Sequence, residues 1–251
     1  MSKKLRVGEL FAGIGGIGLG LERTGGFEVV WQVENNDYAT KVLEKNWPDV
    51  TRHDDVCTFP LEKGEWDVDL ITAGFPCQDI SVAKQRGEGL DGKRSGLFYE
   101  VVRIVDRLRP AAVLLENVSA LLTRGLDSVL GEMASLGYDA EWHCIPAAHV
   151  GAPHRRDRIY IMAYADGKGL QRLGGLEKAS QIFTQEKVGL FRSGVGQDQW
   201  GIEPDVGRMA NGIPRRVDRT KCLGNAVVPQ VAQLLGEMML TRLEAEGELN
   251  K

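Results

Sequence analysis

The chain is 251 residues long, 43% of its residues are apolar, and its formal net charge is −4. These values suit one catalytic domain with a full apolar core and a small insertion. The sequence contains no internal repeat, signal peptide or membrane span, and we therefore expect a cytoplasmic location.

A glycine-rich turn follows the first predicted strand. The strand covers residues 5–10, the turn contains Gly13, Gly15 and Gly16, and a helix is predicted over 16–24. Glycines are needed where the backbone turns sharply and approaches a ligand without an intervening side chain. Taken alone, this turn fits NAD, FAD and S-adenosylmethionine equally well.

The second predicted strand covers residues 28–34 and ends in Glu34. A carboxylate at the end of the second strand suits a ribose diol, which offers two hydroxyl donors. The glycine turn and Glu34 together predict a site for a nucleotide-like cofactor.

The segment GFPCQ, residues 74–78, directly follows an apolar strand predicted over 67–73. A cysteine at the carboxyl end of a strand projects into the crevice where open α/β sheets bind ligands, so Cys77 is a candidate nucleophile. A single cysteine is more often a buried packing residue, and for Cys77 taken alone this alternative stays open.

Two further segments bring charged side chains to the sheet. Glu116 ends a strand predicted over 111–116, although a charge at a helix N-terminus is an alternative interpretation. Arg156 and Arg158 share one face of an incipient strand because their spacing is two residues. This pair suits a carboxylate, a phosphate or a base edge, and also a solvated basic edge.

Strands and helices alternate along the chain, which predicts an α/β fold with a doubly wound, mainly parallel sheet and helices on both faces. The predicted strands cover residues 5–10, 28–34, 67–73, 111–116, 138–146 and 157–164. The predicted helices cover residues 16–24, 37–46, 96–108, 125–136 and 229–246.

Positive charge is concentrated in residues 166–221, which contain ten basic and seven acidic side chains in a chain of net charge −4. Neutralisation of phosphates supplies much of the non-specific affinity for DNA, so a duplex is expected to lie here. An ordinary solvated surface has a similar composition and stays open as an alternative. Glycine-rich pieces within this region predict loops.

The four cysteines form no CxxC pair, which fits free thiols in a reducing compartment. The spacing of His143, Cys144, His149 and His154 matches no usual set of zinc ligands. We therefore expect no metal.

Five segments in a fixed order resemble the cytosine-C5 DNA methyltransferases, and they cover most of residues 5–165 and 208–240. The similar segments are FAGIGG (the cofactor loop), GFPCQ (the nucleophile loop), ENV (the glutamate motif), HRRDR (the QxRxR motif) and LGNAVVP (the last motif). The compact length and the run RMANGIPRRVDR resemble phage and prophage members of that family.

The resemblance implies transfer of a methyl group from S-adenosyl-L-methionine to C5 of a flipped-out cytosine in a specific site of double-stranded DNA. It implies that Cys77 adds to C6 of the base and thereby makes C5 nucleophilic. Glu116 is implied to hydrogen-bond N3 and the exocyclic amine. Arg158 is implied to contact the cytosine O2 and support Cys77, and Arg156 to buttress the loop.

For the cofactor, the resemblance implies Phe11 against the adenine and Glu34 at the ribose hydroxyls. In the run HDDV, alignment on the following valine favours Asp55 over Asp54 as the contact to the adenine amino group. The implied cofactor-binding residues are Phe11, Gly13, Gly15, Gly16, Glu34, Asp55, Pro76 and Asn225.

The resemblance divides the chain into a catalytic and cofactor-binding domain (1–165), a short target-recognition region (166–207) and a C-terminal segment that returns to the catalytic domain (208–251). Three residues depart from the family pattern. Glu9 stands where aspartate is usual, Gly18 stands where arginine is frequent, and His154 stands where the QxRxR motif has glutamine.

Other functions account for fewer of these segments. A nicotinamide-dependent oxidoreductase leaves GFPCQ, ENV and HRRDR unexplained. The transfer-RNA-acting cytosine methyltransferases share the chemistry, but their Cys-Phe-Thr run is absent, as is the Thr-Cys motif of the two-cysteine RNA enzymes. A non-catalytic DNA-binding protein stays open because the recognition region is short. We expect a monomer, either in a restriction-modification system or as a solitary enzyme.

Overall fold

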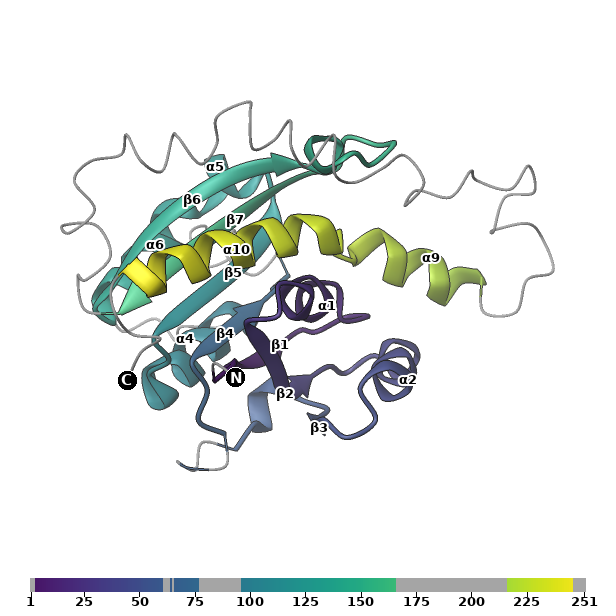
Figure 1. Cartoon of the computed structure of the whole chain (residues 1–251), viewed down its shortest axis with the longest axis horizontal. Coiled ribbons are helices and arrows are strands. Elements are labelled where there is room, and N and C mark those ends of the chain that lie inside the picture. The colour runs from purple at the N-terminus through teal and green to yellow at the C-terminus, as the bar shows by residue number, and fades with distance from the viewer. Residues whose placement is uncertain (1–2, 61–63, 65, 77–95, 166–215, 246–251) are drawn as a thin grey trace.

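The computed structural model describes residues 3–60, 64, 66–76, 96–165 and 216–245 (Figure 1). The candidate nucleophile Cys77 and the predicted target-recognition region over 166–207 lie outside the described residues. Within the described residues, no helix is long and apolar enough to cross a membrane.

Seven strands form one sheet in the order β3-β2-β1-β4-β5-β7-β6. The strands are β1 (Leu5–Leu10), β2 (Phe27–Val33), β3 (Thr51–His53), β4 (Leu70–Ala73), β5 (Ala112–Val118), β6 (Tyr138–Pro146) and β7 (Asp157–Ala165). The first five strands are parallel, and β7 runs antiparallel to both β5 and β6. The predicted doubly wound, mainly parallel sheet is therefore confirmed.

Helices cover both faces of this sheet, as predicted. The longer helices are α1 (Gly16–Arg23), α2 (Asp37–Asn46), α4 (Leu97–Leu108), α6 (Leu126–Ser135), α9 (Arg216–Asn225) and α10 (Pro229–Ala245). The shorter ones are η1 (Val56–Thr58), α5 (Leu121–Arg124) and η2 (Ala147–Val150). Helices α1 and α10 share an apolar cluster with one face, and α4 and α6 share a second cluster with the other.

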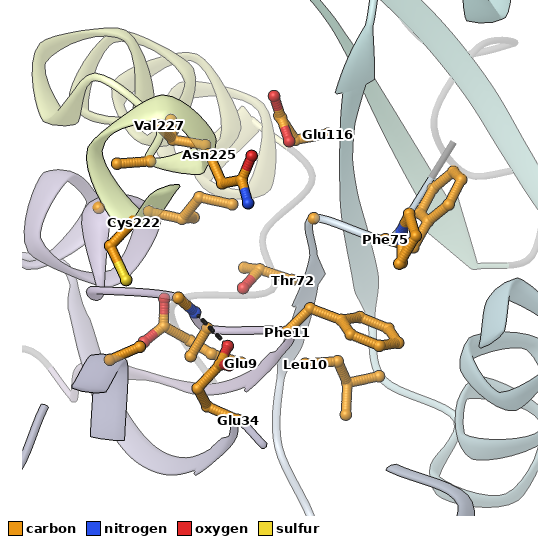
Figure 2. Close-up of a pocket in the computed structure, with 18 of the residues that line it drawn as sticks. Glu9, Leu10, Phe11, Glu34, Thr72, Phe75, Glu116, Cys222, Asn225 and Val227 are labelled. Carbon is orange, nitrogen blue, oxygen red and sulfur yellow. Dashed lines mark hydrogen bonds between the residues drawn. The ribbon is translucent and has the colours of Figure 1, made fainter. Parts of the chain in front are cut away.

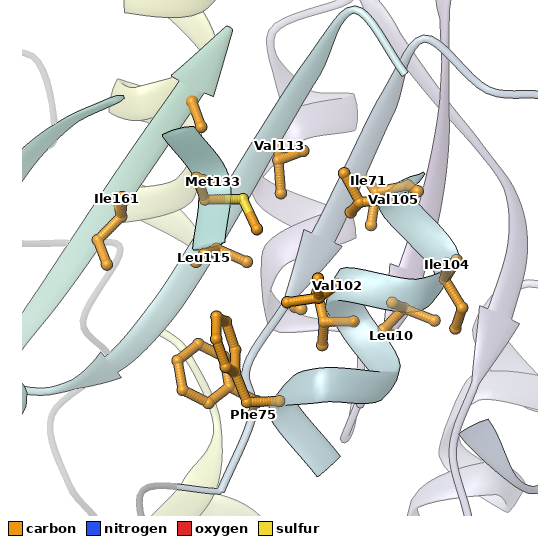
Figure 3. Close-up of a cluster of buried hydrophobic side chains, with 14 of the residues drawn as sticks. Leu10, Ile71, Phe75, Val102, Ile104, Val105, Val113, Leu115, Met133 and Ile161 are labelled. Carbon is orange, nitrogen blue, oxygen red and sulfur yellow. The ribbon is translucent and has the colours of Figure 1, made fainter. Parts of the chain in front are cut away.

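The two-residue alternation of strand β5 assigns its side chains to these clusters. Val113 and Leu115 belong to the α4 and α6 cluster, which Figure 3 shows between sheet and helices. Ala112 and Leu114 belong to the α1 and α10 cluster. The next residue in that second series is Glu116, so its carboxyl group lies on the α1 and α10 face.

The sheet order reverses between β1 and β4. From β1 the chain adds β2 and β3 on one side, and it then adds β4 and β5 on the other. At such a switch point the connections leave in opposite directions, which opens a crevice at the carboxyl ends of the strands. The fold therefore places a ligand site beside the ends of β1 and β4.

All six predicted strands and five predicted helices are present, with bounds that differ by at most three residues. The structure adds β3, α5, α9 and two short 3₁₀ helices. Strand β3 has three residues, too few to show a two-residue alternation in the sequence. Helix α9 has only two aliphatic residues among its ten, Val217 and Leu223, and therefore lacks the apolar stripe from which a helix is predicted.

Candidate active site

A cavity of about 680 Å³ lies at the carboxyl ends of β1, β2, β4 and β5, where the sheet order reverses (Figure 2). It brings together eight of the predicted site residues. These are Phe11, Gly13, Gly16, Glu34, Pro76, Glu116, Arg158 and Asn225. Residues predicted for the cofactor and residues predicted for the base therefore line one cavity.

Glu116 and Arg158 form an ion pair in this cavity. In the antiparallel register of β5 and β7, Val118 lies opposite Arg158, so the arginine is diagonal to Glu116 on the same face. The Arg158 Nε lies 3.0 Å from Glu116 Oε1. A Cβ built on Gly74 would lie 3.3 Å from Glu116 Oε2, so the carboxylate is next to the start of GFPCQ.

Burial raises the pKa of Glu116 to about 7, although the positive charges of Arg158 and Arg156 act in the opposite direction. The side chain is only 8% exposed. Near neutral pH the carboxyl group is therefore present in both protonation states, and it can donate a hydrogen bond as well as accept one.

Glu34 lies at another part of the cavity, at the end of β2. Its Oε2 accepts a hydrogen bond of 2.7 Å from the backbone N–H of Gly13, and its Oε1 accepts one of 2.8 Å from Asn36. These two bonds fix the carboxylate beside the glycine turn. Each oxygen keeps a free lone pair that can accept from a ligand hydroxyl.

Phe11 follows β1 directly and has a left-handed backbone with φ of 55°. A bulky residue in this region is unusual and persists only where neighbouring structure enforces it. Here the next residue, Ala12, donates a 3.0 Å backbone hydrogen bond to Val33. The strained turn brings the Phe11 side chain to the wall of the cavity (Figure 2). The same side chain also packs against the α4 and α6 cluster.

Glu9 also lines the cavity, although the sequence did not predict it as a site residue. It is 1% exposed and accepts hydrogen bonds of 2.7 Å from Gly18 N–H and 2.8 Å from Gln32 Nε2. Burial raises the pKa of Glu9 to about 7, against the effect of both hydrogen bonds. Its position immediately before LFAG was the feature of the sequence that could have identified Glu9 as a site residue.

The last turn of α9 and the residues that follow it close the cavity on one side. Cys222, Asn225, Ala226 and Val227 line it. Figure 2 shows Asn225 and Val227 in the segment formed by α9 and α10, and it shows Glu116, which belongs to β5, near them. Arg156 does not line the cavity, and its Nη2 instead donates two 2.6 Å hydrogen bonds, to the carbonyl oxygens of Gly224 and Ala226.

Two predicted cofactor residues lie outside the cavity wall. Gly15 is the N-cap of α1, with φ of 80°. Asp55 is the N-cap of η1, and its carboxylate accepts from the Cys57 N–H at 2.9 Å. Its neighbour Asp54 lines a second cavity of about 540 Å³, which shares Glu34 with the first. The contact between Asp55 and the adenine amino group stays a prediction.

The candidate nucleophile Cys77 lies outside the described residues, but the two residues before it line the cavity. Phe75 is buried, and its carbonyl oxygen accepts a 3.0 Å hydrogen bond from the side chain of Asn117. Asn117, the middle residue of ENV, therefore ties the β5 motif to the GFPCQ segment. The role of Cys77 stays a prediction.

Besides Glu9, sequence reasoning missed other residues of the cavity wall, among them Thr72, Phe75, Asn117 and Cys222. Phe75 belongs to GFPCQ and Asn117 to ENV, so their position within these two motifs could have identified them as site residues. Thr72 and Cys222 carried no signal of their own.

Among residues 3–60, 64, 66–76, 96–165 and 216–245, no group of three histidine, cysteine or acidic side chains is arranged to hold a metal ion.

Residues 5–203 match the family described as C-5 cytosine-specific DNA methylase. Among curated proteins, the chain is 38% identical to Type II methyltransferase M.Sau3AI of Staphylococcus aureus, over 86% of this chain and 54% of that protein. It is 32% identical to Type II methyltransferase M1.ScrFI of Lactococcus lactis subsp. cremoris, over 87% of this chain and 55% of the other. The chain thus spans about half the length of these relatives.

Solved structures give the same picture of the fold. A putative DNA modification methyltransferase encoded within an Escherichia coli prophage matches with a TM-score of 0.52 and 27% identity, over 64% of this chain and 47% of that one. The DNMT2 of Spodoptera frugiperda matches with a TM-score of 0.55 and 24% identity, over 65% of this chain and 51% of the other. The second likeness concerns the fold alone.

Proposed function

Because this chain belongs to the C-5 cytosine-specific DNA methylase family, we propose that it is a DNA (cytosine-5-)-methyltransferase. On this proposal it transfers a methyl group from S-adenosyl-L-methionine to C5 of a flipped-out cytosine in duplex DNA. The observation that carries the proposal is the joint placement of Glu34 with Gly13, and of Glu116 with Arg158, in one cavity.

The residues around Glu34 fit an adenosyl cofactor. The Glu34 carboxylate is held by two backbone N–H groups and retains acceptor capacity for a pair of ribose hydroxyls. Phe11 supplies an apolar wall, and Asn225 reaches the cavity from the C-terminal segment. When bound, S-adenosyl-L-methionine supplies an electrophilic methyl group on a sulfonium.

We propose that Cys77 performs the covalent step. Its thiolate adds to C6 of the cytosine, and the electron pair displaced from the C5–C6 double bond makes C5 nucleophilic towards the methyl group. Loss of the C5 proton to a base then re-forms the double bond and expels the Cys77 thiolate. The base that takes this proton is not assigned to a side chain.

Glu116 and Arg158 are proposed to hold the pyrimidine and its developing charge. A protonated Glu116 donates to N3, which prevents negative charge from accumulating on the ring while the thiolate adds. Arg158 lies 3.0 Å from that carboxylate and has a guanidinium with further donors for a carbonyl oxygen such as O2. Arg158 therefore both orients Glu116 and offers a contact to the base.

The test is covalent trapping. Purified protein is incubated with S-adenosyl-L-methionine and duplex DNA in which 5-fluorocytosine replaces cytosine, and the products are separated on a denaturing gel. Fluorine cannot leave C5 as a proton does, so the enzyme stays bonded to DNA after methyl transfer. We expect a shifted protein band with wild type and none with Cys77→Ser, and sequencing of the trapped DNA then identifies the target site.

The controls separate the competing proposals. Calorimetric titration with S-adenosyl-L-methionine should give the same affinity for wild type and Cys77→Ser, and a lost affinity would make Cys77 a structural residue. A band with fluorinated RNA but not with DNA would move the substrate to RNA. Cofactor binding without a band on either nucleic acid would favour the non-catalytic alternative.

The partners follow from the proposed reaction. We propose double-stranded DNA as the partner, residues 166–207 as the region that selects the target, and a monomer acting on one flipped base. The Type II names of the curated relatives support a place in DNA modification, with or without a partner nuclease. A cytoplasmic location is proposed on the same grounds.

A further inference from the structure

The segment that closes the cavity is distant in sequence from the sheet that it covers. Asn225 and Val227 line the cavity from the junction between α9 and α10, about seventy residues after β7 begins. The position of this junction determines whether Asn225 faces the ligand. The contacts that hold it are therefore functionally important.

On one side the junction rests on the start of α1. A Cβ built on Gly16 would lie only 2.4 Å from the carbonyl oxygen of Val227, so any larger residue at position 16 would push the two segments apart. Behind this contact α1 and α10 share the same buried apolar cluster, with Leu21 and Val231 among its members. This side of the junction is held by packing.

On the other side the junction is held by Arg156. Its Nη2 donates to the carbonyl oxygens of Gly224 and Ala226, each at 2.6 Å. These carbonyls lie at the end of α9, where backbone acceptors lack partners within the helix and the helix dipole is negative. A guanidinium at this position satisfies the acceptors and complements the dipole.

Although Arg156 does not line the cavity, it lies close enough to Glu116 and Arg158 to interact electrostatically with both. It precedes Arg158 by two residues, and its backbone adopts the left-handed region with φ of 39°. Burial and the nearby charge of Arg158 lower the pKa of Arg156, whereas Glu116 raises it. A strained, partly desolvated arginine beside another arginine is costly, and its two carbonyl contacts offset that cost.

We propose that Arg156 is a positioning residue which caps α9 and holds the α9–α10 junction over the cavity, thereby linking the base-binding edge to cofactor affinity. The proposal rests on the proposed function, because it takes the ligand of the cavity to be S-adenosyl-L-methionine. It differs from a direct role in catalysis, because Arg156 acts through Asn225 and Val227 and not on the pyrimidine.

The experiment compares Arg156→Ala and Arg156→Lys with Arg155→Ala in the full chain. Arg155 is the matched control, since its side chain is 84% exposed and its ion-pair partner is Asp157 at 3.5 Å. Calorimetry measures the S-adenosyl-L-methionine affinity without DNA. We expect Arg156→Ala to weaken it about tenfold or more, as for a lost hydrogen bond to a charged group. Arg155→Ala should bind like wild type, and Arg156→Lys should recover part of the loss.

Steady-state kinetics distinguish positioning from catalysis. In Arg156→Lys, the KM for S-adenosyl-L-methionine should rise while kcat at saturating cofactor stays within about threefold of wild type. An unchanged cofactor affinity with a reduced kcat would overturn the proposal, and so would an equal loss in Arg155→Ala. If Arg156→Ala does not fold, the Arg156→Lys measurements decide. Failure of wild type to bind the cofactor at all would instead refute the proposed function.

Discussion

Glu116 is the residue whose environment most directly matches the proposed chemistry. A solvated glutamate is ionised at neutral pH and can only accept hydrogen bonds. Burial under the α1 and α10 face raises the pKa of Glu116 to about 7, while Arg158 prevents a larger rise. On the proposed mechanism, the pair provides a carboxyl group that can donate to a ring nitrogen and return to its anionic form within one catalytic cycle.

Replacing Glu116 by glutamine should separate binding from chemistry. Glutamine keeps the size and an acceptor for Arg158, but it cannot deliver a proton to N3. We expect kcat to fall by about 10²- to 10⁴-fold, while the affinity for S-adenosyl-L-methionine and the melting temperature stay close to wild type. Single-turnover methylation and calorimetry provide the two measurements, and a variant as active as wild type would remove Glu116 from the mechanism.

The pH dependence of methylation should show the same group. Since the raised pKa of Glu116 is about 7, its protonated form is abundant below pH 7 and is lost above it. We therefore expect kcat to fall at alkaline pH as Glu116 deprotonates, and this alkaline limb should disappear in Glu116→Gln. An alkaline limb that persists in the variant must belong to another group.

At the scale of elements, the start of α1 depends on a side chain from β1. Its N-cap is Gly15, which offers no side-chain acceptor. Glu9 supplies the acceptor from the neighbouring strand by binding the N–H of Gly18. The departures from the family pattern at positions 9 and 18 are thus one arrangement, because a Cβ at position 18 would lie 2.7 Å from Glu9 Oε2. The glutamate side chain at position 9, which is longer than aspartate, occupies the space that the glycine at position 18 leaves open.

A double-mutant cycle at these two positions should be non-additive. Alanine normally stabilises a helix relative to glycine, but Gly18→Ala should destabilise the fold by about 1–3 kcal/mol because it overpacks against Glu9 and Val29. In the Glu9→Asp background the carboxylate is shorter, and the cost of Gly18→Ala should be at least about 0.5 kcal/mol smaller. Urea unfolding measures all four free energies.

Gly131 in α6 is the matched control for this cycle, because within the described part of the chain nothing beyond its chain neighbours and the adjacent backbone of its own helix lies within 4 Å of a Cβ built there. Gly131→Ala should leave the free energy of unfolding unchanged or raise it by about 0.5–1 kcal/mol. Strict additivity between Glu9→Asp and Gly18→Ala would contradict the proposed shared space.

At the scale of the whole molecule, the cavity is built from segments that span most of the described chain, from the turn after β1 to the α9–α10 junction. A ligand that binds in this cavity contacts both ends of the fold. The cavity exists only in the folded state, so the ligand binds the folded chain and not the unfolded one. Binding should therefore stabilise the molecule as a whole against unfolding.

Thermal unfolding should show this linkage. At a concentration of about 100 times its Kd, S-adenosyl-L-methionine should stabilise the fold by about 2.7 kcal/mol, which raises Tm by about 5–10 °C in a chain of this size. Glu34→Gln removes the charged acceptor at the ribose position. At the same cofactor concentration its shift should fall to about 1–2 °C.

The matched control is Glu44→Gln, which removes an exposed carboxylate of α2 that lines only the neighbouring cavity. Its shift should equal that of wild type. If Glu34→Gln and Glu44→Gln lose the cofactor-dependent rise in Tm equally, the loss results from the change in net charge and not from a lost contact to the ribose.

The sequence by itself determined the order of the longer strands and of most of the longer helices, because each of these elements carries its own local signal. In β5 that signal is the continuous apolar run that ends in Glu116, which indicates a buried strand without knowledge of its partner strands. It also determined the family, since FAGIGG, ENV and HRRDR are local strings of residues. Glu34, Glu116 and Arg158 could be named as candidates on that basis.

Only the tertiary structure decided how those candidates are arranged, because their partners lie far away in the sequence. The raised pKa of Glu116 depends on its burial and on Arg158, which the antiparallel register of β7 brings beside it. The carbonyl contacts of Arg156 depend on the α9–α10 junction, which no local pattern places next to β7. Burial, register and distant hydrogen bonds are properties of the folded chain, and they determine which charged residues share the cavity.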